Sequence, residues 1–323
     1  ISDESMLVDY RARMRRISAI VAAIALSACV GVGVAPAPAD PVPSLALGDD
    51  AVTVASFDFT ESAILAELYA QALERRGIRV VRQFRLGPRE FVEPALERGL
   101  VELVPEYAGS LLEFLTRRHA SSADLAEVRR ALEERLTQRG LIAMASAPAQ
   151  DRNAFATTTG FAAANGVASL SDLAEVEGVT LGGPAECPVR PLCLLGLERV
   201  YGISVGSFVA LDLSGPLTQD ALATGVVDVA LVLTTSPMLE ASDLVILDDD
   251  RDLQPAENVT PVVHQSVVER FGPRVGDVID DVSRALTTLQ LRELNTVVEV
   301  DGLGIEVAVA SWLDDHGFPS TGT

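Results

Sequence analysis

The side chains that most often perform catalysis lie scattered along this sequence. Its three histidines share no metal-ligand spacing, and it contains no G-x-S-x-G, H-E-x-x-H, Walker A or G-x-G-x-x-G motif. Glu61, Glu102 and Glu106 could act as acids or bases, but no poised partner accompanies any of them in the sequence. We therefore predict that the protein is not an enzyme, and that it uses no metal and no cofactor.

The N-terminus has the pattern of a bacterial export signal. Four arginines between residues 11 and 16 precede the apolar run Ile17–Leu26, which is shorter than the roughly 20 apolar residues of a membrane span. Leu26-Ser27-Ala28-Cys29 resembles a lipobox, whose cysteine accepts a diacylglycerol; the alternative is an ordinary cleaved signal with a chance cysteine. We predict a signal peptide with an upstream extension over 1–28. We also predict a tether over 29–49, anchored by a lipid on Cys29 to the outer face of the cell membrane.

Two further cysteines occur close together in CPVRPLC. Outside the reducing cytoplasm, Cys187 and Cys193 are predicted to form a local disulfide. A metal site needs more ligands than this pair offers, and a catalytic thiol needs a neighbouring base.

Composition excludes several classes of partner. The formal net charge of −21 repels nucleic-acid phosphates and anionic lipid headgroups.

The acidic run Asp248–Asp250 lacks the spaced ligands and the glycine of a calcium loop, so it is predicted to be a solvated loop. Hydrophobic residues make up 48% of the sequence, which is enough for a substantial core.

The elements that must position any site alternate between strands and helices. This alternation favours an α/β fold with largely parallel sheets, and 323 residues are enough for about two domains. The expected strands are 51–57, 78–81, 100–104, 179–181, 208–211, 227–233, 244–247 and 259–263. A polar, extended segment near 147–153 separates the first α/β unit from the second.

Several segments, taken in order, resemble a known family. These are SFDFTESAILAELYAQALERRG, LGPREFVEPALERGLVELVPEYAGSLLEFL, VRPLCLLGLERVYGI, ALATGVVDVALVLTTSPML and LNTVVEVDGLGIEVAVASWLDDHGF. Together they resemble the glycine betaine, choline and proline (osmoprotectant) substrate-binding proteins of ABC importers. The resemblance covers roughly residues 50–318.

The resemblance implies the type II periplasmic-binding-protein fold. In that fold two α/β lobes are joined by two crossing strands, and the ligand lies in the cleft between them. The implied division places 50–148 and 238–320 in lobe one and 149–237 in lobe two.

The resemblance also implies a ligand site. Tyr107 and Phe155 would offer aromatic faces to a quaternary ammonium group, and Arg190 would clamp a carboxylate. Each has an alternative reading: the two aromatics could be packing residues, and Arg190 could be a solvated surface charge. Leu233 stands where members of the family often have another aromatic residue. The full set of expected ligand contacts is Ser56, Phe57, Asp58, Tyr107, Ser110, Phe155, Arg190, Thr234, Thr235 and Asn258.

Together these features predict an extracytoplasmic lipoprotein that binds a small polar solute by lobe closure. The expected ligand is an osmoprotectant-like quaternary amine or an amino acid, and the expected partner is an ABC importer permease. The protein is expected to be a monomer that binds no nucleic acid. The alternative is a lipid-anchored sensor or scaffold of the same fold that signals to a protein partner.

Overall fold

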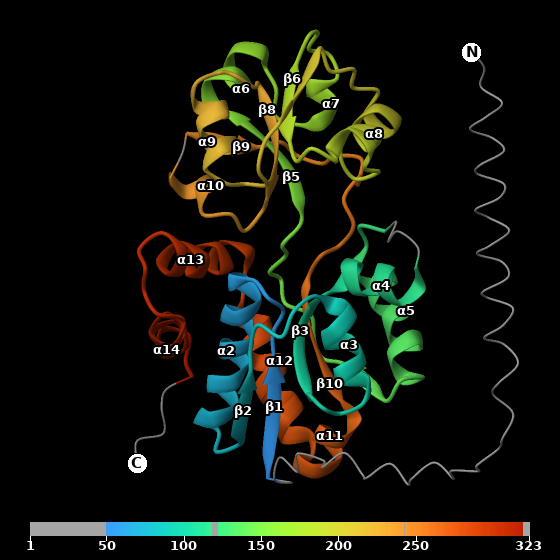
Figure 1. Cartoon of the computed structure of the whole chain (residues 1–323), viewed down its shortest axis with the longest axis vertical. Helices are drawn as coiled ribbons and strands as arrows, with labels where there is room; N and C mark the ends of the chain where they lie inside the picture. Colours follow the sequence, from blue (N-terminus) through green and yellow to red (C-terminus); the bar gives the residue numbers. More distant parts are fainter. Residues whose placement is uncertain (1–49, 118–121, 242, 319–323) are drawn as a thin grey trace, which may run out of the picture. The chain divides into compact units, whose positions relative to one another are not determined.

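The computed structural model describes residues 50–117, 122–241 and 243–318 (Figure 1). The predicted signal peptide, Cys29 and the predicted tether lie outside these residues. Within the described part of the chain, no helix combines the length and the apolarity that a membrane crossing requires.

The first sheet has five strands in the order β2-β1-β3-β10-β4. Strand β1 is parallel to both β2 and β3, whereas β10 is antiparallel to both β3 and β4. Four of the five strands therefore run in the same direction, as predicted, and only β10 among them is reversed, because it enters this sheet from the other lobe. The strands are β1 (Ala51–Ala55), β2 (Arg79–Gln83), β3 (Leu103–Tyr107), β4 (Leu141–Ala143) and β10 (Val259–His264).

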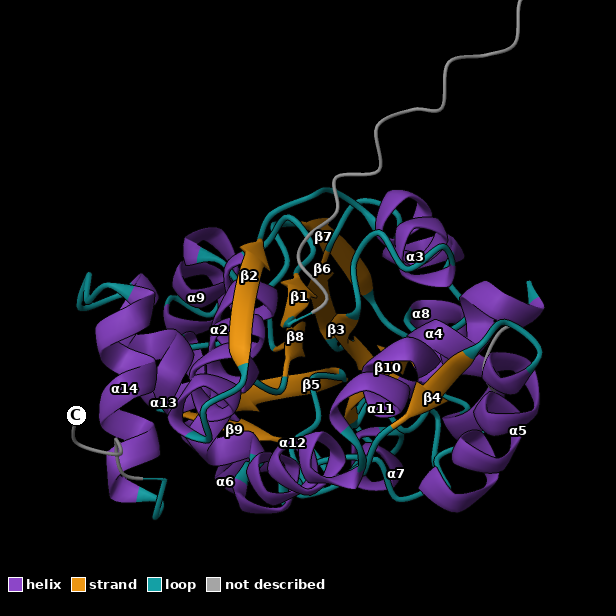
Figure 2. Cartoon of the chain, turned by 90° about the horizontal axis from the view of Figure 1, so that it is seen from below, coloured by secondary structure: helices purple, strands orange, loops and turns teal. Residues whose placement is uncertain are grey.

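Helices cover both faces of the first sheet (Figure 2). Alternate residues of a strand point to opposite faces, so Leu103 packs into one apolar cluster and Val104 into another. The helix α2 (Thr60–Arg75) is buried along most of its length between the sheet and α12 and α14. The other helices of this lobe are α3 (Arg89–Glu97), α4 (Ala108–Thr116), α5 (Leu125–Thr137), α11 (Gln265–Phe271), α12 (Pro273–Ala285), α13 (Thr288–Glu299) and α14 (Ile305–Asp315).

The second sheet has the order β7-β6-β8-β5-β9, and it is mixed in the same way. Its strands are β5 (Asn153–Thr158), β6 (Thr180–Gly183), β7 (Ser207–Ala210), β8 (Val229–Leu233) and β9 (Leu244–Ile246). Its helices are α6 (Thr159–Asn165), α7 (Leu170–Leu173), η1 (Cys187–Val189), α8 (Leu194–Gly196), the π-helical turn η2 (Leu197–Tyr201), α9 (Pro216–Ala223) and α10 (Met238–Ala241).

The chain passes between the sheets twice. It leaves the first sheet after β4 and enters the second at β5, and it returns between β9 and β10, over residues 247–258. The predicted return of lobe one at residue 238 is therefore misplaced: Met238 packs into the second lobe, and β9 pairs with β5. The sequence could not reveal this, because a short apolar edge strand suits either sheet. The predicted fold of two α/β lobes is otherwise confirmed.

The strand expected over 100–104 lies further along the chain, at Leu103–Tyr107. Pro105, Glu106 and Tyr107 belong to β3 and pair with β10, and Pro105 lies opposite Pro261. Because two residues without N–H groups face each other there, the prolines are tolerated within the sheet. The strand thus carries Tyr107 to the carboxyl end of the sheet, where α4 begins.

Candidate ligand-binding cleft

The loop between β1 and α2 presents one aromatic ring at the end of the first sheet. Ser56 is buried and fixes this loop, because its Oγ accepts a hydrogen bond from the backbone N–H of Arg85 at 2.8 Å. Phe57 is also buried, and its ring stacks 6.0 Å from that of Phe59. Phe59 is 41% exposed, and its ring lies 6.3 Å from that of Tyr107. The ring available to a ligand is therefore that of Phe59, and the predicted contact Phe57 packs behind it.

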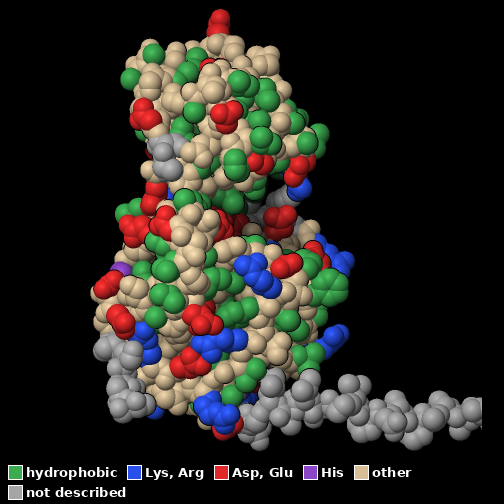
Figure 3. Space-filling model, turned by 60° about the vertical axis from the view of Figure 1, so that its left-hand side comes forward, with side chains coloured by type: hydrophobic (Ala, Val, Ile, Leu, Met, Phe, Trp, Pro, Cys, Tyr) green, Lys and Arg blue, Asp and Glu red, His purple; other side chains and the backbone are tan. Residues whose placement is uncertain are grey.

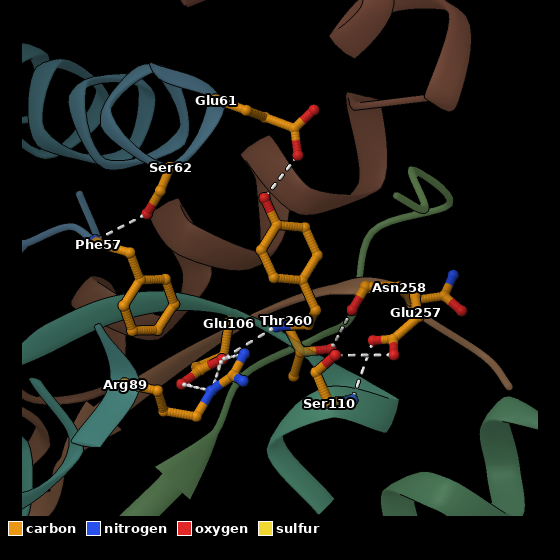
Figure 4. A network of polar contacts seen from close by, with 10 residues as sticks. Phe57, Glu61, Ser62, Arg89, Glu106, Ser110, Glu257, Asn258 and Thr260 are labelled. Carbon is orange, nitrogen blue, oxygen red and sulfur yellow. Dashed lines mark hydrogen bonds and ion pairs between the residues drawn. The ribbon is translucent and has the colours of Figure 1, made fainter. Parts of the chain in front are cut away.

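Tyr107 is held by a buried carboxylate of the same lobe. Its hydroxyl donates to Glu61 Oε1 at 2.5 Å (Figure 4). Asn295 Nδ2 donates to Glu61 Oε2 at 2.6 Å. Burial raises the pKa of Glu61 above its ordinary value, against the opposing effect of these hydrogen bonds. Burial also raises the pKa of Tyr107, as does the neighbouring Glu61, so the phenol stays protonated and remains a donor.

A second pair of contacts fixes the other side of the Tyr107 strand. Arg89 forms a bidentate ion pair with the fully buried Glu106, with Nη2 to Oε2 at 2.9 Å, and its guanidinium lies 5.2 Å from the centre of the Phe57 ring. Ser110 donates from its backbone N–H and its Oγ to Glu257, at 3.0 and 2.8 Å. Burial raises the pKa of Glu257 to about 7.

Two cavities adjoin the hydrogen-bonded residues around Tyr107. Both cavities have Phe59, Asp151 and Leu233 in their walls. Figure 3 shows acidic side chains gathered where the surface is hollowed between the two lobes. The first cavity, of about 310 Å³, is lined by Phe59, Arg89, Tyr107, Ser110, Glu113, Asp151, Arg152, Asn153, Leu192, Leu233, Gln254, Pro255 and Glu257. The second, of about 410 Å³, is lined by Phe59, Thr60, Glu61, Asp151, Leu213, Ser214, Leu233, Thr235, Ser236, Pro237, Asn295 and Glu299.

Asp151 lies in the wall of both cavities, on the first crossing between the lobes. Thr235 Oγ1 donates to its Oδ1 at 2.7 Å. Burial raises the pKa of Asp151 to about 8, and the nearby charge of Glu61 adds to this effect. A ligand cation placed here would favour the ionised carboxylate and compensate for its burial.

The predicted disulfide between Cys187 and Cys193 is present. Its loop places Arg190 in the wall of a third, smaller cavity of about 200 Å³, which shares Glu113, Asn153 and Leu192 with the first cavity, called the Tyr107 cavity below. Arg190 does not line the Tyr107 cavity; the arginines that do are Arg89 and Arg152.

The structure brings together three of the residues predicted to contact a ligand. Tyr107 and Ser110 line the first cavity, and Thr235 lines the second. The others, which line neither of these two cavities, are Ser56, Phe57, Asp58, Phe155, Arg190, Thr234 and Asn258.

Several of those residues have structural partners instead. Phe155 packs in the core of the second lobe and is 1% exposed. Thr234 Oγ1 donates to the carbonyl of Gln150, and Asn258 Nδ2 donates to the carbonyl of Ala147, so both tie the crossings to their neighbours.

Other cavity residues escaped the sequence reasoning. Phe59, Asp151, Gln254, Glu257 and Asn295 come from four separate stretches of the chain. The one available signal was the position of Phe59 directly before α2, at the end of the loop that follows β1.

Comparisons with known proteins identify related sequences. Residues 50–315 match the family model described as the substrate binding domain of ABC-type glycine betaine transport systems. The chain is 28% identical to the glycine betaine-binding protein YehZ of Escherichia coli K12, over 83% of this chain and 91% of that protein. It is 27% identical to a glycine-betaine-binding protein of Pseudomonas aeruginosa, over 80% of this chain and 85% of that protein.

Solved structures show the same fold. The crystal structure of a glycine betaine/carnitine/choline ABC transporter superposes with a TM-score of 0.76, at 23% identity, and covers 83% of this chain and 99% of that one. Apo YehZ superposes with a TM-score of 0.73 at 27% identity, with the same coverage. Since the family model spans most of the sequence, the chain belongs to the family of substrate-binding domains of ABC-type glycine betaine transport systems.

Proposed function

We propose that this protein captures a small solute with a cationic nitrogen, a quaternary amine or an amino acid, and delivers it to an ABC importer. The observation that carries the proposal is the pairing of an exposed aromatic ring, Phe59, with the carboxylates of Asp151 and Glu257 around the same cavity. Aromatic faces and carboxylates both attract a cation.

The position of Arg152 favours a zwitterion as one form of that ligand. Arg152 lines the Tyr107 cavity together with the adjacent Asp151. A guanidinium beside a carboxylate can hold the acidic end of an amino acid or betaine while the carboxylate faces its nitrogen. The family resemblance implied this clamp at Arg190, which lines the adjoining third cavity.

Lobe closure follows from where the lining residues originate. Tyr107 comes from the first lobe, Leu192 and Leu233 come from the second, and Asp151 and Gln254 come from the two crossings. A ligand in the cavity touches all three parts. It therefore shifts the equilibrium between the open and closed arrangements of the lobes toward the closed one. The size of the shift is set by the difference between the ligand's affinities for the closed and the open arrangement.

The test is a thermal-shift screen with betaine, choline, carnitine and proline, followed by calorimetry on each compound that stabilises the protein. Phe59→Ala should weaken binding about tenfold, because it removes a desolvated cation–π contact. The matched control is Phe91→Ala, since Phe91 is 71% exposed and lines neither cavity. A flat response to every compound would overturn the proposal.

We also propose export and lipid anchoring through Cys29, on the pattern of residues 11–29. Cys29→Ser should move the protein from the membrane fraction to the soluble extracytoplasmic fraction. An unchanged distribution between the two fractions would contradict the anchor without affecting the ligand site.

A further inference from the structure

Gln254 leaves an unpaired hydrogen-bond acceptor in the wall of the Tyr107 cavity. Its side-chain Nε2 donates to the carbonyl of Leu192 at 3.0 Å, which fixes the orientation of the amide. Gln254 is 2% exposed, and among the described residues its Oε1 has no hydrogen-bond partner.

Asn295 has the same arrangement in the wall of the second cavity. Its Nδ2 donates to Glu61 Oε2 and to the carbonyl of Thr235, so its orientation is fixed as well. Asn295 is 4% exposed, and its Oδ1 finds no partner in the described part of the chain. Each cavity thus has a buried amide oxygen that can only accept a hydrogen bond.

The hydroxyl donors near these oxygens are already engaged. Tyr107 donates to Glu61, Ser110 to Glu257 and Thr235 to Asp151. Arg89 is paired with Glu106 in the same wall, and the proposed function assigns Arg152 to the acidic end of a ligand. Since no described residue donates to either amide oxygen, a bound ligand can supply the missing donors.

We propose that the paired cavities select organic cations that carry at least one N–H donor over fully methylated ammonium ions. The inference rests on the proposed function and narrows its ligand class. A primary, secondary or tertiary ammonium group brings both the positive charge that the carboxylates attract and the N–H that an amide oxygen requires.

A trimethylammonium group brings the charge alone. It has no N–H, so Gln254 Oε1 and Asn295 Oδ1, which are already buried, would stay unpaired in the complex. A ligand that leaves such a buried acceptor unpaired should bind about tenfold more weakly than a ligand that donates a hydrogen bond to it.

The experiment is a methylation series at constant charge: ethanolamine, its N-methyl and N,N-dimethyl derivatives, and choline, each titrated into the full mature protein by calorimetry. Affinity should fall about tenfold at the last step, where the only remaining N–H is lost. A parallel series from glycine through sarcosine and dimethylglycine to glycine betaine tests the same step in zwitterions.

The outcomes separate this inference from the function on which it rests. If both series bind and choline or betaine binds most tightly, the inference is wrong and the proposed function stands. If no member of either series binds, the inference is overturned, and the thermal-shift response to carnitine and proline decides separately whether the proposed function stands.

A variant links the effect to one atom. Gln254→Met keeps the length of the side chain but removes its acceptor, so the ratio of affinities for dimethylethanolamine and choline should fall toward one, and Asn295 Oδ1 accounts for the preference that remains. Gln138→Met, at the exposed C-terminal end of α5, is the matched control and should keep the wild-type ratio. Should Gln254→Met fail to fold, the wild-type series decides the inference by itself.

Discussion

The two lobes contribute walls of opposite character to the same cavities. The first lobe supplies Glu61, Tyr107 and Asn295, whose buried polar groups are joined by hydrogen bonds. The second lobe supplies only uncharged side chains to these walls, apolar ones such as Leu192 and Leu233 alongside neutral polar ones such as Ser214. The crossings between the lobes add the acids Asp151 and Glu257.

This difference separates two physical tasks. Polar groups fixed by partners are preorganised, so they lose little entropy when a ligand arrives, and they discriminate by charge and by donor geometry. Apolar side chains exclude water and strengthen the electrostatic interactions beside them. The first lobe and the crossings should therefore determine which ligand binds, and the second lobe should mainly set how tightly the cavity closes.

The largest expected effect comes from removing a shared acid. Asp151→Asn keeps the size of the side chain but removes the charge, and should weaken binding of a cationic ligand about 30-fold or more, corresponding to about 2 kcal/mol. The matched control is Glu175→Gln on the exposed surface of the second lobe. An equal loss of affinity in both variants would show that the net charge of the protein, rather than the carboxylate of Asp151, attracts the ligand.

The same substitution should stabilise the unliganded protein at high pH. The pKa of Asp151 is raised from 3.8 to about 8 by folding, so the stability penalty of ionising it grows as pH rises between those values. Thermal unfolding should show a larger gain for Asp151→Asn near pH 9 than near pH 5. A gain that does not change with pH would contradict the raised pKa.

An intermediate effect is expected from pH in the wild-type protein. The pKa values of Glu257 and Asp151 are raised to about 7 and about 8, in surroundings that also contain Glu61, Glu106 and Arg89. A cation binds the ionised carboxylates more tightly than the protonated ones, with partial release of protons below these pKa values, so affinity should rise about tenfold from about pH 6 to about pH 9. Calorimetry in buffers of different ionisation enthalpy should detect proton release. Its absence would place the ligand away from these acids.

The smallest effect is expected from the second lobe. Replacing both Cys187 and Cys193 by serine should lower stability by about 2 kcal/mol, because a short loop is no longer closed. Affinity should fall only about threefold, through the Leu192 carbonyl that holds Gln254. An affinity loss larger than that of Asp151→Asn would reverse the proposed division between the lobes.

Some features of this molecule follow from local patterns in the sequence. The alternation of strands and helices predicted an α/β fold, and the closeness of Cys187 and Cys193 in the chain predicted their disulfide. Tyr107 and Ser110 were found through a contiguous motif, and they do line the same cavity. The fold and disulfide predictions succeed because each depends on residues that are near one another in the chain, whereas ligand contact by Tyr107 and Ser110 stays a prediction.

Only the tertiary structure decided the composition of the cavities. Asp151 meets Thr235, and Glu61 meets Asn295, across separations of 84 and 234 residues. The exposure of Phe59 in place of Phe57, and the burial of Phe155, depend on which side of a loop or strand faces the core. The pKa values of Asp151 and Glu257 are raised because these carboxyl groups are buried. That burial depends on the tertiary structure, since both crossings and both lobes must pack together to exclude water. The sequence specifies which residues are present, but their protonation states and their neighbours are determined only when distant segments pack together.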